Sequence, residues 1–169
     1  IDFSGKNVLV RVDFNVPMDK TGKVTDDTRV KASLATLNYI REKGAKVIVT
    51  SHLGRPKGKR VEEYSLKPVA PVLAGLLKME VLFIEDCIGE KALRAVAGMK
   101  AGEVILLENL RFHPGEDKND EAFAQELAKL CDVYINDAFA VSHRAAASNT
   151  AITKFVPLCA AGFLLKNEI

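Results

Sequence analysis

Arginine and histidine side chains recur in the polar segments that follow the short apolar runs of this sequence. The three histidines, His52, His113 and His143, each lie within three residues of an arginine. A planar guanidinium group binds phosphate or carboxylate through two parallel hydrogen bonds. These residue types therefore predict a site for a small anion. Asp13 and Asn15 add acceptors that suit a hydroxyl group or fix an arginine side chain.

Short apolar runs alternate with helical patterns, and these elements must position the polar segments. The expected strands are Val8–Phe14, Val47–Val49, Val81–Ile84, Val104–Leu107 and Val133–Ile135. The expected helices cover about 27–43 with a stop at Gly44, 66–77 with Ser65 as N-cap, and about 120–130. This alternation predicts an α/β fold with a doubly wound parallel sheet, a Rossmann-like three-layer αβα arrangement.

The polar segments directly follow four of the five predicted strands. They cover residues 13–17, 51–56, 108–115 and 136–144. Because ligands of open parallel sheets bind outside the carboxyl ends of the strands, we expect these segments to meet at one edge of the sheet. The net charge of +2 then conceals a local basic surface.

Length and composition indicate one globular domain and exclude several classes of function. A chain of 169 residues with 48% hydrophobic residues can bury a substantial core. A nearly balanced charge of 24 basic against 22 acidic residues argues against nucleic acid or a membrane as partner. The three cysteines, Cys87, Cys131 and Cys159, are widely spaced, which predicts small core residues and a cytoplasmic protein.

Several other motifs are incomplete. Gly54 and Gly58 faintly resemble a P-loop, but their spacing is too short and Arg60 replaces the Ser or Thr that would hold magnesium. A G-x-G-x-x-G fingerprint does not follow the first strand, which disfavours dinucleotide binding. Asp137, Ser142 and His143 lack the G-x-S-x-G context of a hydrolase. The acidic pairs at 62–63 and 116–117 are expected to be solvated loop charges.

Four strings in order resemble the N-terminal domain of the phosphoglycerate kinase family. They are RVDFNVP (11–17), SHLGRP (51–56), LLENLRFHPGE (106–116) and NDAFAVSHRAAAS (136–148). The final stretch, AAGFLLKNEI (160–169), is similar to the start of the helix that leads to the second domain of that family. The resemblance implies a substrate-binding α/β domain over 1–155 and the start of an interdomain helix over 156–169. It also implies that the C-terminal nucleotide-binding domain is absent.

The family transfers a phosphoryl group between 1,3-bisphosphoglycerate and ADP, giving 3-phosphoglycerate and ATP, with Mg²⁺. The resemblance therefore implies a glycolytic phosphotransferase whose acceptor is a carboxyl group. It implies that 3-phosphoglycerate or 1,3-bisphosphoglycerate binds to this chain, whereas ATP or ADP with Mg²⁺ binds to the missing domain. The chain alone is then expected to bind substrate without turnover, to hold neither cofactor nor metal, and to have its own C-terminal domain as partner.

The resemblance also implies which residues form the substrate site. Asp13 and Asn15 match the family's acceptor pair, and Arg29 matches the arginine aimed at the transferred phosphoryl group. The remaining substrate-binding positions are His52, Arg55, Arg111 and Arg144. Because a carboxylate nucleophile needs no general base, we assign His52 to binding and Arg29 to catalysis.

The sequence departs from the family pattern at three small residues. Ala140 and Ala151 stand where the family usually has glycine, and Ala146 stands where His or Gln is common. At these positions the hydrogen bonding near Arg144 is therefore expected to differ from that of the family. An alternative function is a stand-alone sensor or scaffold that binds small anions without catalysis.

Overall fold

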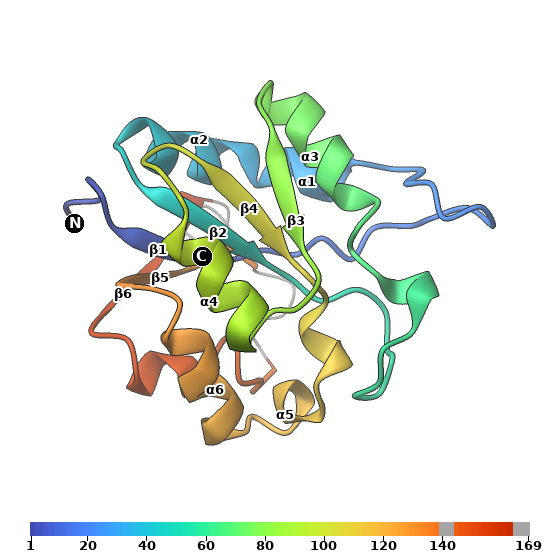
Figure 1. Cartoon of the computed structure of the whole chain (residues 1–169). Coiled ribbons are helices and arrows are strands. Elements are labelled where there is room, and N and C mark those ends of the chain that lie inside the picture. The colour runs from blue at the N-terminus through green and yellow to red at the C-terminus, as the bar shows by residue number, and fades with distance from the viewer. Residues whose placement is uncertain (139–143, 164–169) are drawn as a thin grey trace.

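Six parallel strands form a single sheet in the computed structural model, which describes residues 1–138 and 144–163 (Figure 1). The strands are β1 (Asn7–Arg11), β2 (Lys46–Thr50), β3 (Val81–Ile84), β4 (Val104–Leu107), β5 (Val133–Asn136) and β6 (Leu158–Ala161). Their order in the sheet is β3-β4-β2-β1-β5-β6, so β1 lies between β2 and β5. The chain therefore reverses its direction of winding at β1, and the predicted doubly wound sheet is confirmed.

Helices cover both faces of the sheet (Figure 1). The helices are α1 (Thr28–Ala32), α2 (Leu34–Glu42), α3 (Val69–Leu77), α4 (Gly89–Ala97), α5 (Pro114–Asp117) and α6 (Glu121–Ala128). Side chains of β1 alternate between two apolar clusters, because successive residues of a strand point to opposite faces. Val8 and Val10 pack with α1, α2 and α3, whereas Leu9 packs with α4 and α6.

The five predicted strands correspond to β1–β5, and the helix predicted over 120–130 corresponds to α6. Asp120 caps α6 by accepting a 2.9 Å hydrogen bond from the backbone N–H of Phe123. The single helix expected over 27–43 is two helices. They meet at Ser33, whose hydroxyl donates to the carbonyl of Val30 and competes with regular helical bonding.

Two expectations about helix boundaries are wrong. The helix expected from Leu66 begins at Val69, with Pro68 rather than Ser65 at the N-cap. Residues Leu158–Ala161 form β6, a strand paired with β5, where the start of an interdomain helix was expected over 156–169. The sheet therefore extends beyond residue 155. Residues 164–169, where the rest of that helix would fall, lie outside the described residues.

Among the described residues, the elements not predicted from the sequence also include α4, α5 and short 3₁₀ helices. The 3₁₀ helices are η1 (Glu62–Tyr64), η2 (Leu110–Phe112) and η4 (Ala151–Lys154). Within residues 1–138 and 144–163, no helix has both the length and the apolar character needed to cross a bilayer.

Candidate functional site

The seven residues that the sequence analysis selected as a site surround one cavity of about 290 Å³. The complete lining consists of Asp13, Asn15, Arg29, His52, Gly54, Arg55, Arg111 and Arg144, which we call the basic cavity. The segments after β1, β2 and β4 contribute most of these side chains, and α1 contributes Arg29. Parallel strands therefore bring residues more than 100 positions apart in the sequence to the same edge of the sheet.

Asp13, Asn15 and Arg29 are joined at one side of the basic cavity. The Nη1 of Arg29 donates to the backbone oxygen of Asn15 at 2.8 Å and lies 3.3 Å from a carboxylate oxygen of Asp13. The Arg29 side chain is half exposed, whereas Asp13 is almost buried. A single carboxylate among four arginines leaves this cavity strongly positive, which suits an anionic ligand.

His52 is buried, with only 3% of the residue exposed, and its Nδ1 lies 3.0 Å from Nη2 of Arg11. Burial is the main cause that lowers the pKa of His52 to about 2, and the charges of Arg11, Arg111, Arg29 and Arg144 lower it further. The imidazole is therefore neutral at physiological pH. Such a ring binds through a hydrogen bond and does not serve as an acid at pH 7.

The three other arginines of the basic cavity differ in how they are held. Arg111 is nearly buried, donates to the backbone oxygen of Gly54 at 2.9 Å, and lies 3.3 Å from a carboxylate oxygen of Asp117. Burial lowers the pKa of Arg111, and Asp117 opposes this effect. Arg55 and Arg144 are exposed, so two of the guanidinium groups lie where a ligand enters from solvent.

Asn109 and Gly54 connect the loops that follow β1, β2 and β4. The buried Asn109 amide accepts from the backbone N–H groups of Leu53 and Arg111 and donates to the backbone oxygens of Leu53 and Tyr64. Gly54 has a φ of +61°, and an added Cβ would lie 2.5 Å from the Tyr64 ring. Its N–H donates to Oδ1 of Asn15 at 2.9 Å. The loop after β2 is thus tied to the loops after β1 and β4.

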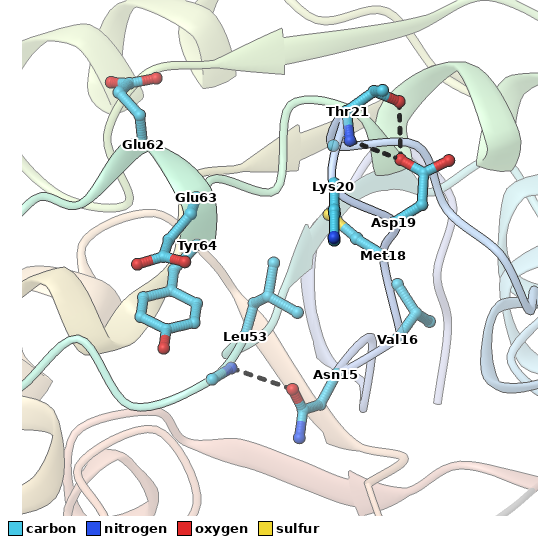
Figure 2. A pocket seen from close by; sticks show the side chains of 12 residues that line it. Asn15, Val16, Met18, Asp19, Lys20, Thr21, Leu53, Glu62, Glu63 and Tyr64 are labelled. Carbon is cyan, nitrogen blue, oxygen red and sulfur yellow. Dashed lines mark hydrogen bonds between the residues drawn. The ribbon is translucent and has the colours of Figure 1, made fainter.

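A second cavity of about 540 Å³ shares Asn15 and Gly54 with the basic cavity (Figure 2). Its charged side chains are those of Lys20 and of three acidic residues, Asp19, Glu62 and Glu63. Asp19 closes a turn by accepting from the backbone N–H and the hydroxyl of Thr21 (Figure 2). The larger cavity is therefore acidic, whereas the smaller basic cavity is the one whose charge suits an anion.

Several expectations from the sequence need correction at this edge of the sheet. Glu116, expected to be a solvated loop charge, is fully buried and pairs with Arg11. Arg11 was not among the residues predicted to be functional, although a charged side chain in an otherwise apolar strand is itself a signal. Cys87 is buried as expected, but Cys131 is partly exposed and Cys159 is exposed.

The departures from the family pattern have different outcomes. Ala151 is buried, and its backbone N–H donates to the side-chain oxygen of Asn119. The backbone N–H of Ala146 donates to the side-chain oxygen of Asn149. The amide nitrogen of the same Asn149 side chain donates to the backbone oxygen of Arg144. Alanine is therefore compatible with the local hydrogen bonding at both positions. Ala140, like Ser142 and His143, lies outside the described residues.

In the described part of the chain, one cluster has the donor types of a metal site, formed by Asp86, Cys87 and His113. Their ligand atoms lie within 4.8 Å of one another. However, Nε2 of His113 and a carboxylate oxygen of Asp86 already form a 2.7 Å hydrogen bond. Burial raises the pKa of the Cys87 thiol well above its usual range, so the thiol is protonated in the metal-free chain. The cluster is best described as a hydrogen-bonded Asp–His pair.

The fold and the basic cavity define a parallel α/β domain with an arginine-rich cavity at the carboxyl ends of its strands. The family model described as "Phosphoglycerate kinase" matches residues 1–169. The chain therefore belongs to the phosphoglycerate kinase family, and the resemblance drawn from the sequence is confirmed.

Relatives and solved structures agree with this assignment. The chain is 58% identical over 165 residues to phosphoglycerate kinase of Geobacter metallireducens, covering 98% of the chain and 42% of that relative. It is 55% identical over 169 residues to that of Desulforapulum autotrophicum, covering 100% of the chain and 43% of that relative. The phosphoglycerate kinase structure from Pyrococcus horikoshii matches with a TM-score of 0.90 and 39% identity, covering 99% of the chain and 42% of that structure. The chain thus spans less than half the length of these relatives.

Proposed function

We propose that this chain is the part of a phosphoglycerate kinase that binds 3-phosphoglycerate and 1,3-bisphosphoglycerate. The observation that carries the proposal is the convergence of Asp13, Asn15, Arg29, His52, Arg55, Arg111 and Arg144 on one basic cavity. A ligand with a phosphate, a carboxylate and a hydroxyl group matches the donors and acceptors of this cavity. In the whole protein, the phosphoryl group would pass between this ligand and ADP or ATP.

Catalysis in this proposal depends on positioning and on positive charge. Phosphoryl transfer needs the reacting oxygens in line and the charge on the transferred group neutralised. We assign the second task to Arg29, because its half-exposed side chain can leave Asp13 and reach a group held at the mouth of the cavity. Asp13 and Asn15 would hold Arg29 in place until the ligand arrives.

The proposal requires no general base in this cavity. The nucleophile in the ATP-consuming direction is a carboxylate, which is already ionised at neutral pH. The buried and neutral His52 suits a binding role, because its low pKa prevents it from exchanging protons near pH 7.

The same donor set does not suit Mg²⁺. This ion prefers oxygen ligands in octahedral geometry, whereas arginines dominate the basic cavity and its one carboxylate is paired with Arg29. We therefore assign Mg²⁺ and the adenine nucleotide to the part of the longer protein that this chain does not include.

Calorimetry on the 169-residue chain tests the binding proposal. We expect 3-phosphoglycerate to bind and its affinity to fall as the salt concentration rises, because exposed charges contribute to the site. Glycerol 3-phosphate, which lacks the carboxylate, should bind at least about tenfold more weakly, since a charge-assisted hydrogen bond contributes about 1.5–3 kcal/mol. Absence of any response to millimolar 3-phosphoglycerate would contradict the proposal.

Two further outcomes separate the alternatives. Equal affinity for glycerol 3-phosphate and 3-phosphoglycerate would favour a general phosphate sensor over a kinase domain. A coupled assay should detect no ATP formation by the chain alone, and turnover in that assay would overturn the assignment of the nucleotide to a missing part.

A further inference from the structure

His52 is backed by a buried group of polar residues that do not line the basic cavity. Nη2 of Arg11, at the end of β1, lies 3.0 Å from Nδ1 of His52 and 3.7 Å from a carboxylate oxygen of Glu116. Its Nε donates to the hydroxyl of Ser148 at 2.9 Å, and Ser148 in turn donates to Glu116 at 2.5 Å. Each of these side chains is almost completely buried. We call Arg11, Glu116 and Ser148 the Arg11 anchor.

The contact with Arg11 determines which nitrogen of His52 carries the proton. A guanidinium group donates hydrogen bonds and does not accept them, so Nδ1 of His52 must be the acceptor. In a neutral imidazole one nitrogen accepts and the other carries the proton. The proton therefore resides on Nε2, and the ring offers a donor at this position.

The Arg11 anchor leaves its guanidinium little freedom. Its Nε contacts Ser148, and its Nη1 contacts the backbone oxygen of Val12. Its Nη2 contacts both His52 and Glu116. Glu116 is fixed as well, because it also accepts from the backbone N–H of Ser148 at 2.8 Å. A buried charge is tolerated when it is paired and hydrogen-bonded, and this network meets both conditions.

We propose that Arg11, Glu116 and Ser148 are positioning residues that hold His52 in its Nε2–H tautomer, so that the basic cavity presents a hydrogen-bond donor to an anionic oxygen of the substrate. The opposite tautomer would present a lone pair to a negatively charged oxygen and weaken binding. The proposal takes the anionic ligand from the proposed function, but the tautomer of the free protein is independent of any ligand.

Nitrogen NMR of the imidazole rings measures this tautomer directly. With only three histidines in the chain, ¹⁵N-histidine labelling gives few signals, and His52→Gln identifies those of His52. We expect a protonated Nε2 and an unprotonated Nδ1 for His52 from pH 5.5 to pH 8. A charged ring at pH 7, or a proton on Nδ1, would overturn the proposal without any further variant.

Ser148→Ala tests whether the Arg11 anchor sets the tautomer, because it removes one hydroxyl that links Arg11 and Glu116. Ser33→Ala is the matched control, since Ser33 is a buried serine whose hydroxyl bonds only locally to the oxygen of Val30. We expect mixed tautomers of His52 in Ser148→Ala and the parent signals in Ser33→Ala. Affinity for 3-phosphoglycerate should fall about tenfold in Ser148→Ala and little in Ser33→Ala.

Glu116→Gln provides a second variant and should also mix the tautomers if the chain folds. Parent tautomer signals in folded Ser148→Ala or folded Glu116→Gln would refute the positioning role. The outcomes also separate this inference from the proposed function. An Nε2–H tautomer without 3-phosphoglycerate binding contradicts only the function, whereas binding with the other tautomer contradicts only the positioning role.

Discussion

Arg29 differs from the other cavity arginines because it is paired with a carboxylate that also lines the cavity. Its guanidinium contacts Asp13 and the backbone of Asn15 in the free chain, so a ligand must compete with these partners. If Arg29 leaves these partners only as the phosphoryl group is transferred, its new contact stabilises the transition state more than the ground state.

Arg29→Ala in the longer enzyme should therefore lower kcat more than it weakens binding of 3-phosphoglycerate. One well-placed arginine in phosphoryl transfer contributes on the order of a thousandfold. Steady-state kinetics separates kcat from KM, and titration of the same variant measures ligand affinity. Equal losses in kcat and affinity would make Arg29 an ordinary ligand residue.

His52 couples the stability of the chain to pH. The ring binds a proton at about pH 6.5 in the unfolded chain, whereas burial and the surrounding arginines lower its folded pKa to about 2. Below pH 6.5 the unfolded state thus binds more protons, and acidification favours unfolding. We expect His52 to lower the free energy of unfolding by about 2 kcal/mol between pH 8 and pH 5.

Urea unfolding of the parent and of His52→Gln at several pH values checks this coupling. Carboxylates contribute to the pH dependence of both proteins, so the difference between them isolates His52. The parent should lose more stability than His52→Gln on acidification. Parallel pH profiles would show that His52 binds protons equally in the folded and unfolded chain, against the lowered pKa.

At the scale of elements, the loop after β2 is fixed by a backbone conformation that favours glycine. Gly54 combines a φ of +61° with close contact to Tyr64, and its N–H holds Asn15. Gly54→Ala should lower the free energy of unfolding by at least about 2 kcal/mol, since left-handed backbone alone costs alanine about 1–2 kcal/mol. Denaturant unfolding measures this loss.

Gly22→Ala is the matched control for Gly54→Ala. Gly22 has a φ of +83°, and no atom lies within 4 Å of the position its Cβ would take. The Gly22→Ala variant should lose only the stability that the left-handed backbone costs alanine, and it should keep its affinity for 3-phosphoglycerate. The Gly54→Ala variant should lose affinity as well. Equal losses of stability would exclude a steric effect of Tyr64.

The predictable parts of the fold are those encoded by local pattern. Continuous apolar runs predicted β1–β5, and the loops at their carboxyl ends brought the predicted residues to one cavity. In contrast, β6 consists of Leu158–Ala161, which lacks β-branched residues and is a strand because it pairs with β5. The burial of Glu116 was equally hidden, since it depends on Arg11, more than 100 residues away.

At the scale of the whole molecule, the position of charge is more informative than its total. The chain carries a net charge of +2, yet four arginines surround a single cavity. Arg55 is exposed at this cavity, and among the described residues no carboxylate lies within 4 Å of its guanidinium. The free chain therefore contains mutual repulsion that an anion relieves.

Arg55→Gln and Arg94→Gln lower the net charge equally. Comparing them therefore separates the effect of where a charge lies from the effect of the total charge. Arg94 is exposed on α4 and pairs with Glu90, away from the cavity lining. Arg55→Gln should reduce both the affinity for 3-phosphoglycerate and its salt dependence, with a gain in stability of at most about 0.5 kcal/mol. Arg94→Gln should keep the affinity and lose about 0.3–0.5 kcal/mol with its ion pair.

Titrations at two ionic strengths and denaturant unfolding of both variants give these values. Equal effects of the two substitutions on ligand affinity would indicate that only the net charge of the molecule matters.

The central position of β1 has a consequence for the order in which this chain folds. β1 pairs with β2 on one side and with β5 on the other, and the residues of β5 lie about 125 positions after those of β1 in the sequence. The charge of Arg11 can likewise be paired and buried only after Glu116 and Ser148 have been synthesised. β1 can therefore be completed only after β5 has been synthesised, and until then the nascent chain must keep that side of β1 available for pairing.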